Sequence, residues 1–174
     1  MTIERRLARS SFTLTRDYPA PAGHVWRAFA QEDRKRQWWG AGDAMEPREW
    51  AFDFRVGGRD VAEGRFHHGP VSRYEAVYTD IVEPVRIVTT YDMWIDGEHM
   101  STSLASLEFE AIADGTRFTH TEHGVFFDRF WADGPQRERG TRGLLDQLGR
   151  YLAGPGAAGR TGNPRRHGRP DPAG

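Results

Sequence analysis

Apolar and polar residues alternate near the start of the chain, which predicts a half-buried β-strand. In residues 11–18, Phe12 and Leu14 alternate with Thr13 and Thr15, so one face of the strand would be apolar. Two prolines follow and end the strand, because proline has no backbone N–H to donate to a sheet.

The pattern then changes to helical spacing. Residues 22–30 are predicted to form a short amphipathic helix, since Val25, Trp26 and Phe29 fall on one face. A second short helix is predicted over residues 34–39, with Asp33 as a candidate N-cap and two glycines after it.

The middle of the chain, from residue 44 to residue 125, has the pattern of an antiparallel meander. The predicted strands are residues 50–56, 59–66, 71–82, 86–95, 100–111 and 117–125. Asp-Gly pairs at 96–97 and 114–115 are strong hairpin signals, because glycine tolerates the positive φ that such turns require. Short turns between neighbouring strands favour antiparallel pairing.

Helical spacing returns near the end of the chain and predicts one long helix over residues 135–153. Its apolar stripe consists of Leu144, Leu145, Leu148, Tyr151 and Leu152. Residues 154–174 are rich in glycine, proline and arginine, a composition that predicts a flexible tail. We therefore divide the chain into an N-terminal extension (1–10), one domain (11–153) and the tail.

Composition excludes several classes of function and partner. The chain has 174 residues, 37% of them apolar, a formal net charge of −1 and no cysteine. The near-neutral charge argues against nucleic acid as a partner, and the absence of cysteine excludes disulfides and thiolate chemistry. No segment is apolar over the roughly 18 residues that a spanning helix needs, so we expect no membrane partner and a cytoplasmic location.

Several short motifs occur in a fixed order along the chain: YPAP and VWRAF at 18–21 and 25–29, WWG at 38–40, VGGR at 56–59, IVEPVRIV at 81–88 and GTRF at 115–118. Together they resemble the bacterial branch of the START-like (SRPBCC) superfamily that is named after the activator of Hsp90 ATPase. The resemblance implies an α+β helix-grip fold, in which a curved antiparallel sheet of six or seven strands surrounds the C-terminal helix. One departure is that Gly140 is followed by Thr141, where many members have Gly-Trp.

The resemblance also implies a cavity between sheet and helix, used across the superfamily for apolar ligands, with no fixed catalytic set and no cofactor. If one face of the sheet lines this cavity, alternate residues of each strand point into it. With the helix and the Trp38-Trp39 pair, the expected lining is Trp39, Thr89, Tyr91, Met93, Ser103, Ala105, Phe118, His120, Leu144 and Leu148. Trp39 either packs at the rim beside an inward Trp38 or closes the cavity as a lid.

His120 and Glu122 form the most distinctive polar pattern, because residues two apart on a strand share a face. A carboxylate beside an imidazole could provide acid–base catalysis, with Tyr91 as a third group. The alternative is a structural pair satisfied by Tyr91 or solvent. His67 and His68 would point to opposite faces, and no metal-binding spacing occurs, so we expect no metal site.

Three functions follow from these features. The first is binding of a small apolar or amphipathic ligand without catalysis. The second is an enzyme of the polyketide cyclase or aromatase type that uses His120, Glu122 and Tyr91. The third is a co-chaperone-like protein-interaction module. Exposed strand edges also make a homodimer a reasonable expectation.

Overall fold

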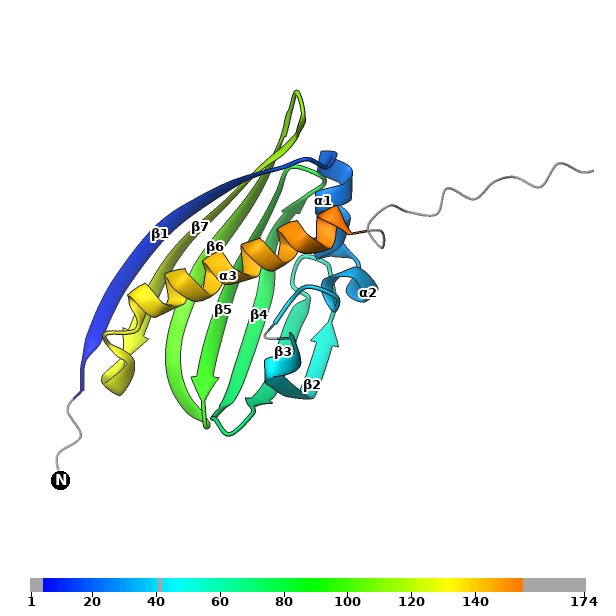
Figure 1. Ribbon diagram of the computed structural model, residues 1–174. Helices are drawn as coiled ribbons and strands as arrows, with labels where there is room; N and C mark the ends of the chain where they lie inside the picture. Colours follow the sequence, from blue (N-terminus) through cyan, green and yellow to red (C-terminus); the bar gives the residue numbers. More distant parts are fainter. Residues whose placement is uncertain (1–4, 41, 155–174) are drawn as a thin grey trace, which may run out of the picture.

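The computed structural model describes residues 5–40 and 42–154, which form one curved sheet and the helices packed on it (Figure 1). The strands are β1 (Leu7–Tyr18), β2 (Met45–Phe52), β3 (Arg59–Phe66), β4 (Val71–Val82), β5 (Arg86–Ile95), β6 (Glu98–Ile112) and β7 (Gly115–Phe127). The helices are α1 (Ala22–Ala30), α2 (Glu32–Lys35) and α3 (Gly134–Ala153), with 3₁₀ turns η1 (Gly42–Ala44) and η2 (Asp128–Phe130).

The seven strands pair antiparallel in the order β1-β7-β6-β5-β4-β3-β2. Both Asp-Gly pairs lie at hairpin turns, as predicted. Asp96 and Gly97 have φ of 50° and 79°, the signs that a tight hairpin turn requires. At Gly115 a Cβ atom would lie 2.0 Å from the Tyr18 carbonyl oxygen, so only glycine fits where β7 begins.

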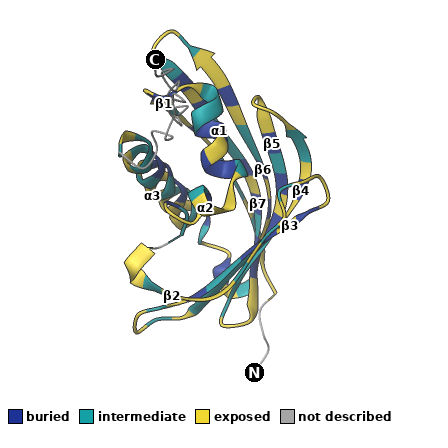
Figure 2. Cartoon of the chain, turned by 90° about the vertical axis from the view of Figure 1, so that its right-hand side faces the viewer, coloured by how far each residue is buried: buried dark blue, intermediate teal, exposed yellow. Residues whose placement is uncertain are grey.

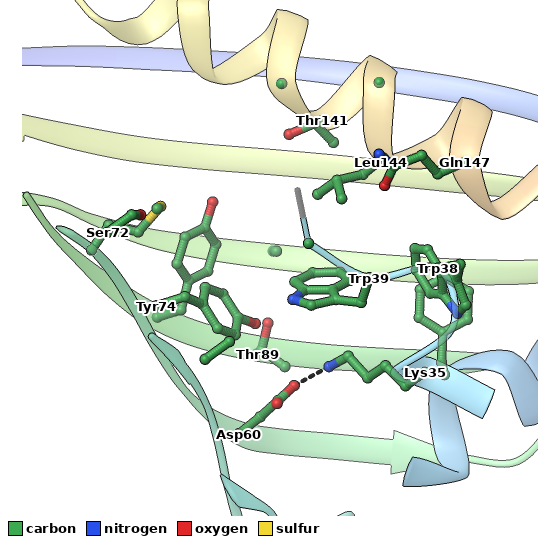
Figure 3. Close-up of a pocket in the computed structure, with 18 of the residues that line it drawn as sticks. Lys35, Trp38, Trp39, Asp60, Ser72, Tyr74, Thr89, Thr141, Leu144 and Gln147 are labelled. Atoms are coloured by element: carbon green, nitrogen blue, oxygen red, sulfur yellow. Dashed lines mark hydrogen bonds and ion pairs between the residues drawn. The ribbon is translucent and has the colours of Figure 1, made fainter. Parts of the chain in front are cut away.

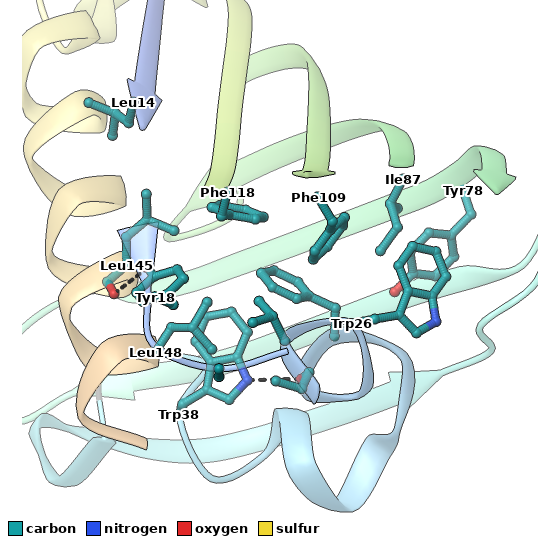
Figure 4. Close-up of a cluster of buried hydrophobic side chains, with 14 residues drawn as sticks. Leu14, Tyr18, Trp26, Trp38, Tyr78, Ile87, Phe109, Phe118, Leu145 and Leu148 are labelled. Carbon is teal, nitrogen blue, oxygen red and sulfur yellow. Dashed lines mark hydrogen bonds between the residues drawn. The ribbon is translucent and has the colours of Figure 1, made fainter. Parts of the chain in front are cut away.

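All three α-helices lie on the concave side of the sheet (Figures 1 and 2). α1 packs its apolar face on the sheet, where Trp26 meets Phe109 edge-on at a ring-centroid distance of 5.2 Å and Phe29 stacks on Phe118 at 5.2 Å. The buried cluster around these rings, which we call the packed cluster, is drawn in Figure 4. It consists of Leu14, Tyr18, Ala20, Val25, Trp26, Ala28, Phe29, Trp38, Tyr78, Ile87, Phe109, Phe118, Leu145 and Leu148.

Most elements occur where the hydrophobic pattern places them, and the sheet has seven strands, within the predicted six or seven. β3, β4 and β5 have the predicted bounds, and α3 begins one residue before the predicted helix. Residues 155–174, which include nearly all of the predicted tail, lie outside the described residues.

β6 and β7 extend beyond their predicted bounds by at most two residues at each end, and three elements differ by more. β1 begins at Leu7, which pairs with Phe127, so part of the predicted N-terminal extension belongs to the sheet. α2 covers only Glu32–Lys35, and its N-cap is Gln31 rather than Asp33. Gln31 has an extended backbone between the two helices, so α1 ends and α2 begins at this residue.

The third difference is at β2, which covers Met45–Phe52 instead of residues 50–56. The backbone after Phe52 turns away and binds β4: the Gly57 N–H donates to the Tyr78 carbonyl at 2.8 Å, and the Tyr78 N–H donates to the Gly58 carbonyl at 3.1 Å. These bonds take the segment out of the pairing with β3.

Candidate functional site: a cavity under the C-terminal helix

A cavity of about 730 Å³ lies between the concave face of the sheet and α3 (Figure 3). Strands β4 and β5 line one side, α3 lines the opposite side, and the segment that follows α2 closes one end. The residues labelled in Figure 3 that line it are Lys35, Trp38, Trp39, Asp60, Ser72, Tyr74, Thr89, Thr141, Leu144 and Gln147.

Small residues leave this space open. Ala62 and Ala105 line it from the sheet, and Gly140 and Gly143 line it from α3. A Cβ atom built on either glycine would meet nothing within 4 Å. Because interiors normally pack without voids of this size, the cavity is a feature that the side-chain sizes of this region create.

The two adjacent tryptophans have different environments. Trp38 is buried in the packed cluster, and its Nε1–H donates to the Ala28 carbonyl at 2.9 Å. Trp39 is half-buried, and its ring lies beside that of Tyr74 in the cavity lining, at a ring-centroid distance of 5.5 Å. Trp38 therefore packs inward, while Trp39 offers its ring to the cavity.

One buried ion pair borders the cavity near α2. Lys35, the chain's only lysine, pairs with Asp60, and the two residues are 4% and 1% exposed. Tyr78 donates its hydroxyl to Asp60 Oδ2 at 3.0 Å, and the Lys35 ammonium lies 4.4 Å from the centre of the Trp39 ring. A buried lysine requires such a partner, because an uncompensated charge in the interior is very costly.

A second buried ion pair joins α3 to the sheet. Arg137 Nη1 donates to Glu122 Oε1 at 3.2 Å and to the Tyr91 hydroxyl at 2.8 Å, and Nη2 donates to Ser101 Oγ at 2.7 Å. Ser103 also donates to Glu122 Oε1, at 3.0 Å. Glu122 is 2% exposed, so the guanidinium compensates its charge directly.

His120 approaches the other oxygen of this carboxylate. Its Nε2 lies 3.5 Å from Glu122 Oε2, and its ring stacks on Phe12 at a centroid distance of 5.9 Å. Burial raises the pKa of Glu122, but the contact with the His120 imidazole and the charge of Arg137 lower it by more. The pKa of Glu122 therefore lies below its ordinary value. Glu122 is therefore a stable carboxylate and a weak base.

The tyrosines of the site remain protonated. Burial raises the pKa of Tyr74, Tyr78 and Tyr91 well above the ordinary value for tyrosine. Each hydroxyl therefore keeps its proton near neutral pH and is available as a hydrogen-bond donor.

The structure places most of the predicted lining residues at the cavity. These are Trp39, Thr89, Tyr91, Met93, Ala105, His120 and Leu144, and the catalytic candidate Glu122 also lines it. Phe118 and Leu148 do not, because both are fully buried in the packed cluster, where α1 fills the concave face. Ser103 has the predicted orientation, but it lies behind the lining and is bonded to Glu122 and Arg137.

Six charged residues that line the cavity were not predicted, and three of them, Lys35, Asp60 and Arg137, form its buried ion pairs. Arg137 carried a usable signal, since it lies seven residues before Leu144 and therefore on the same face of the helix. Asp60 also carried one, because a carboxylate within a predicted strand needs a partner if its face is buried. Neither signal identifies the partner, which comes from a distant part of the chain.

Among the described residues, no group of three or more histidine or acidic side chains is placed to hold a metal ion. None of the helices in residues 5–40 and 42–154 is long and apolar enough to cross a membrane.

The curved sheet, the long C-terminal helix across it and the cavity between them define a helix-grip protein of the START-like class. Comparison with family models gives a match over residues 19–153 to the family described as activator of Hsp90 ATPase homolog 1-like protein. The chain therefore belongs to this family. Membership supports a ligand-binding or Hsp90 ATPase-activator-like domain and specifies neither a ligand nor a reaction.

Solved structures of bacterial proteins agree with this assignment. The protein Mll3558 from Rhizobium loti is 42% identical, with a TM-score of 0.78 over 84% of this chain and 99% of that one. A protein from Rhizobium leguminosarum is 33% identical, with a TM-score of 0.82 over 86% and 98%. An AHSA1-like protein from Aeromonas hydrophila, 20% identical with a TM-score of 0.65 over 91% and 99%, shares the fold. A comparison with curated proteins found no match.

Proposed function

We propose that this protein binds a small apolar or amphipathic molecule in the cavity between the sheet and α3. The observation that carries this proposal is the space of about 730 Å³ bordered by aromatic side chains. Pockets for drug-sized molecules have volumes of about 300–1,000 Å³ and mainly apolar walls.

The cavity wall is suited to holding such a molecule. Trp39, Tyr74 and Tyr91 present adjoining rings, with centroid distances of 5.5 Å and 5.0 Å between neighbours. Aromatic rings bury a large apolar area at little cost in side-chain entropy. Ligand binding would also remove from water the apolar surface that the cavity exposes.

The polar cluster at the end of the cavity favours binding over acid–base catalysis. A general base works best when its pKa lies near the working pH, whereas the pKa of Glu122 is lowered. Its Oε1 atom also accepts hydrogen bonds from Arg137 and Ser103. This arrangement resembles a structural tie between α3 and the sheet more than a poised catalytic pair.

Two fluorescent probes test the proposal: N-phenyl-1-naphthylamine, which is neutral, and anilinonaphthalene sulfonate, which is an anion. We expect at least one of them to bind saturably, with one site per chain. Leu144 points from α3 into the cavity (Figure 3), so Leu144→Trp should fill part of the space and weaken binding about tenfold or more.

Arg139→Trp is the matched control, because Arg139 is exposed on α3 and does not line the cavity. It should leave probe affinity unchanged. Gly140→Phe provides a second block, since a side chain at this position meets no neighbouring atom at Cβ. If neither probe binds, or if Leu144→Trp and Gly140→Phe bind as tightly as Arg139→Trp, the proposed function is wrong.

A further inference from the structure

The charged side chains that line the cavity are all paired with other side chains of the protein. Lys35 pairs with Asp60, and Arg137 pairs with Glu122. The remaining ones, Arg36, Glu49 and Glu63, pair with Glu32, Arg73 and Arg73 at 2.9, 2.6 and 3.2 Å. The imidazole of His120, which also lines the cavity, faces Glu122 Oε2 at 3.5 Å. No lysine, arginine, aspartate or glutamate that lines the cavity, within the described parts of the chain, is left unpaired to compensate a charge on a ligand.

This pairing penalises a charged ligand. A carboxylate that entered the cavity would lose its hydration and would need a cation. The least exposed cations are Lys35 and Arg137, with side chains 5% and 9% exposed. Moving either toward the ligand would leave Asp60 or Glu122 buried without compensation. Breaking a buried pair in this way is strongly unfavourable.

Neutral polar groups, in contrast, remain available. The hydroxyl groups of Tyr74 and Thr89 line the cavity, and neither makes a hydrogen bond to another described residue. Both residues lie on the sheet side of the cavity in Figure 3. A hydroxyl can donate and accept, so these two groups can bind an alcohol, a phenol or a carbonyl without a change of charge.

The shape of the wall adds a preference for flat rings. Trp39 and Tyr74 meet at an angle of 56°, and Tyr74 and Tyr91 meet at 45°, so the three rings form an angled aromatic surface. Aromatic pairs gain energy from tilted and edge contacts beyond the area that they bury.

From these observations we infer that the cavity is selective for an uncharged aromatic ligand and discriminates against the corresponding carboxylate. This inference rests on the proposed function and specifies the chemical class of the ligand. The internal pairing of Lys35 and Arg137 is the source of the selectivity.

Three probes with one ring system isolate the effect of charge: 2-naphthol, methyl 2-naphthoate and 2-naphthoate. Near pH 7 the first two are neutral and the third is an anion. We expect the naphthol and the ester to bind by isothermal titration, and the carboxylate to bind at least about tenfold more weakly than its ester.

Two variants that release a cation sharpen this test. Glu122→Gln leaves Arg137 without its carboxylate, and Asp60→Asn does the same for Lys35. In each variant we expect the affinity for 2-naphthoate to rise about tenfold relative to the affinity for its ester, since a hydrogen bond to a charged group contributes that much. Glu138→Gln is the matched control, because it removes the same charge from a pair with Arg142 on the outer side of α3.

The outcomes separate this inference from the proposed function. If the carboxylate binds as tightly as its ester to the unmodified protein, charge selectivity is wrong while ligand binding stands. If both variants leave the ratio of ester affinity to carboxylate affinity unchanged, the ion pairs are not the source of the charge selectivity and the inference is overturned. If none of the three compounds binds, the inference is wrong, and the two fluorescent dyes then decide whether the cavity binds any molecule.

Discussion

Strands β4 to β7 contribute to both ends of the concave face, but the two ends differ: one, the packed end, holds the packed cluster, and the other, the hollow end, holds the cavity. At one end α1 inserts Trp26 and Phe29 against Phe109 and Phe118, so the space is filled by rings in contact (Figure 4). At the other end α3 and the segment that follows α2 border the sheet, and a cavity of about 730 Å³ remains between them and the strands.

The difference shows that the position of α1, together with side-chain size, decides which end of the concave face is filled. α3 contributes Leu145 and Leu148 to the packed cluster, whereas Gly140 and Thr141, one turn earlier, line the cavity, which Leu145 also borders. Charges follow the same division, because the buried ion pairs Lys35–Asp60 and Arg137–Glu122 both border the hollow end. Buried ion pairs therefore hold the helices to the sheet at the hollow end, whereas apolar contacts do so at the packed end.

The largest expected effect is at the packed end. Phe118→Ala should lower the free energy of unfolding by about 3–5 kcal/mol, because it opens a void among rings that cannot collapse. Met93→Ala at the partly buried wall of the cavity should cost less than about 2 kcal/mol, since Met93 already borders empty space. Urea titrations measure both. An equal loss at the two positions would mean that the hollow end is packed as tightly as the other.

The next effect concerns the tie between α3 and the sheet. Arg137→Met should lower the free energy of unfolding by about 3 kcal/mol, because Glu122 stays buried without its cation. The double variant Arg137→Met with Glu122→Leu should regain most of this loss, since it removes both charges.

Arg142→Met is the control for this tie, as Arg142 forms an exposed pair with Glu138 and should contribute less than about 0.5 kcal/mol. A thermal unfolding series on the four proteins compares them directly. If Arg137→Met and Arg142→Met have equal effects, the buried pair is not what holds α3 to the hollow end.

The smallest effect is a loss of stability at alkaline pH. Burial raises the pKa of Tyr18 and Tyr78 at the packed end and of Tyr74 and Tyr91 at the hollow end. A pKa that is higher in the folded state gives stability that is present below the unfolded value of about 10 and is lost as pH rises above it.

Absorbance at 295 nm measures phenol ionisation directly. We expect these four tyrosines to ionise above pH 10, together with unfolding, and Tyr74→Phe should remove one such group. Ionisation of Tyr74 or Tyr91 near pH 10 in the folded protein would show that the hollow end is as hydrated as bulk water.

Much of this architecture could be predicted from residue patterns alone. Alternation located the strands, and the Asp-Gly pairs at 96–97 and 114–115 located two hairpins. The inward orientation of Thr89, Tyr91 and Ala105 followed from strand parity, because the side-chain period of a strand is fixed at two residues. These are local properties, so nearby residues suffice to determine them.

Only the tertiary structure determined which side chains are covered and which distant residues pair with them. Phe118 and His120 share one strand face, yet α1 covers the first and leaves the second at the cavity. Glu122 finds Arg137 fifteen residues away and Lys35 finds Asp60 twenty-five residues away, through a crossing of helix and sheet that no local pattern encodes. Burial and pairing depend on contacts between distant segments, and these exist only after the sheet has curved around its helices.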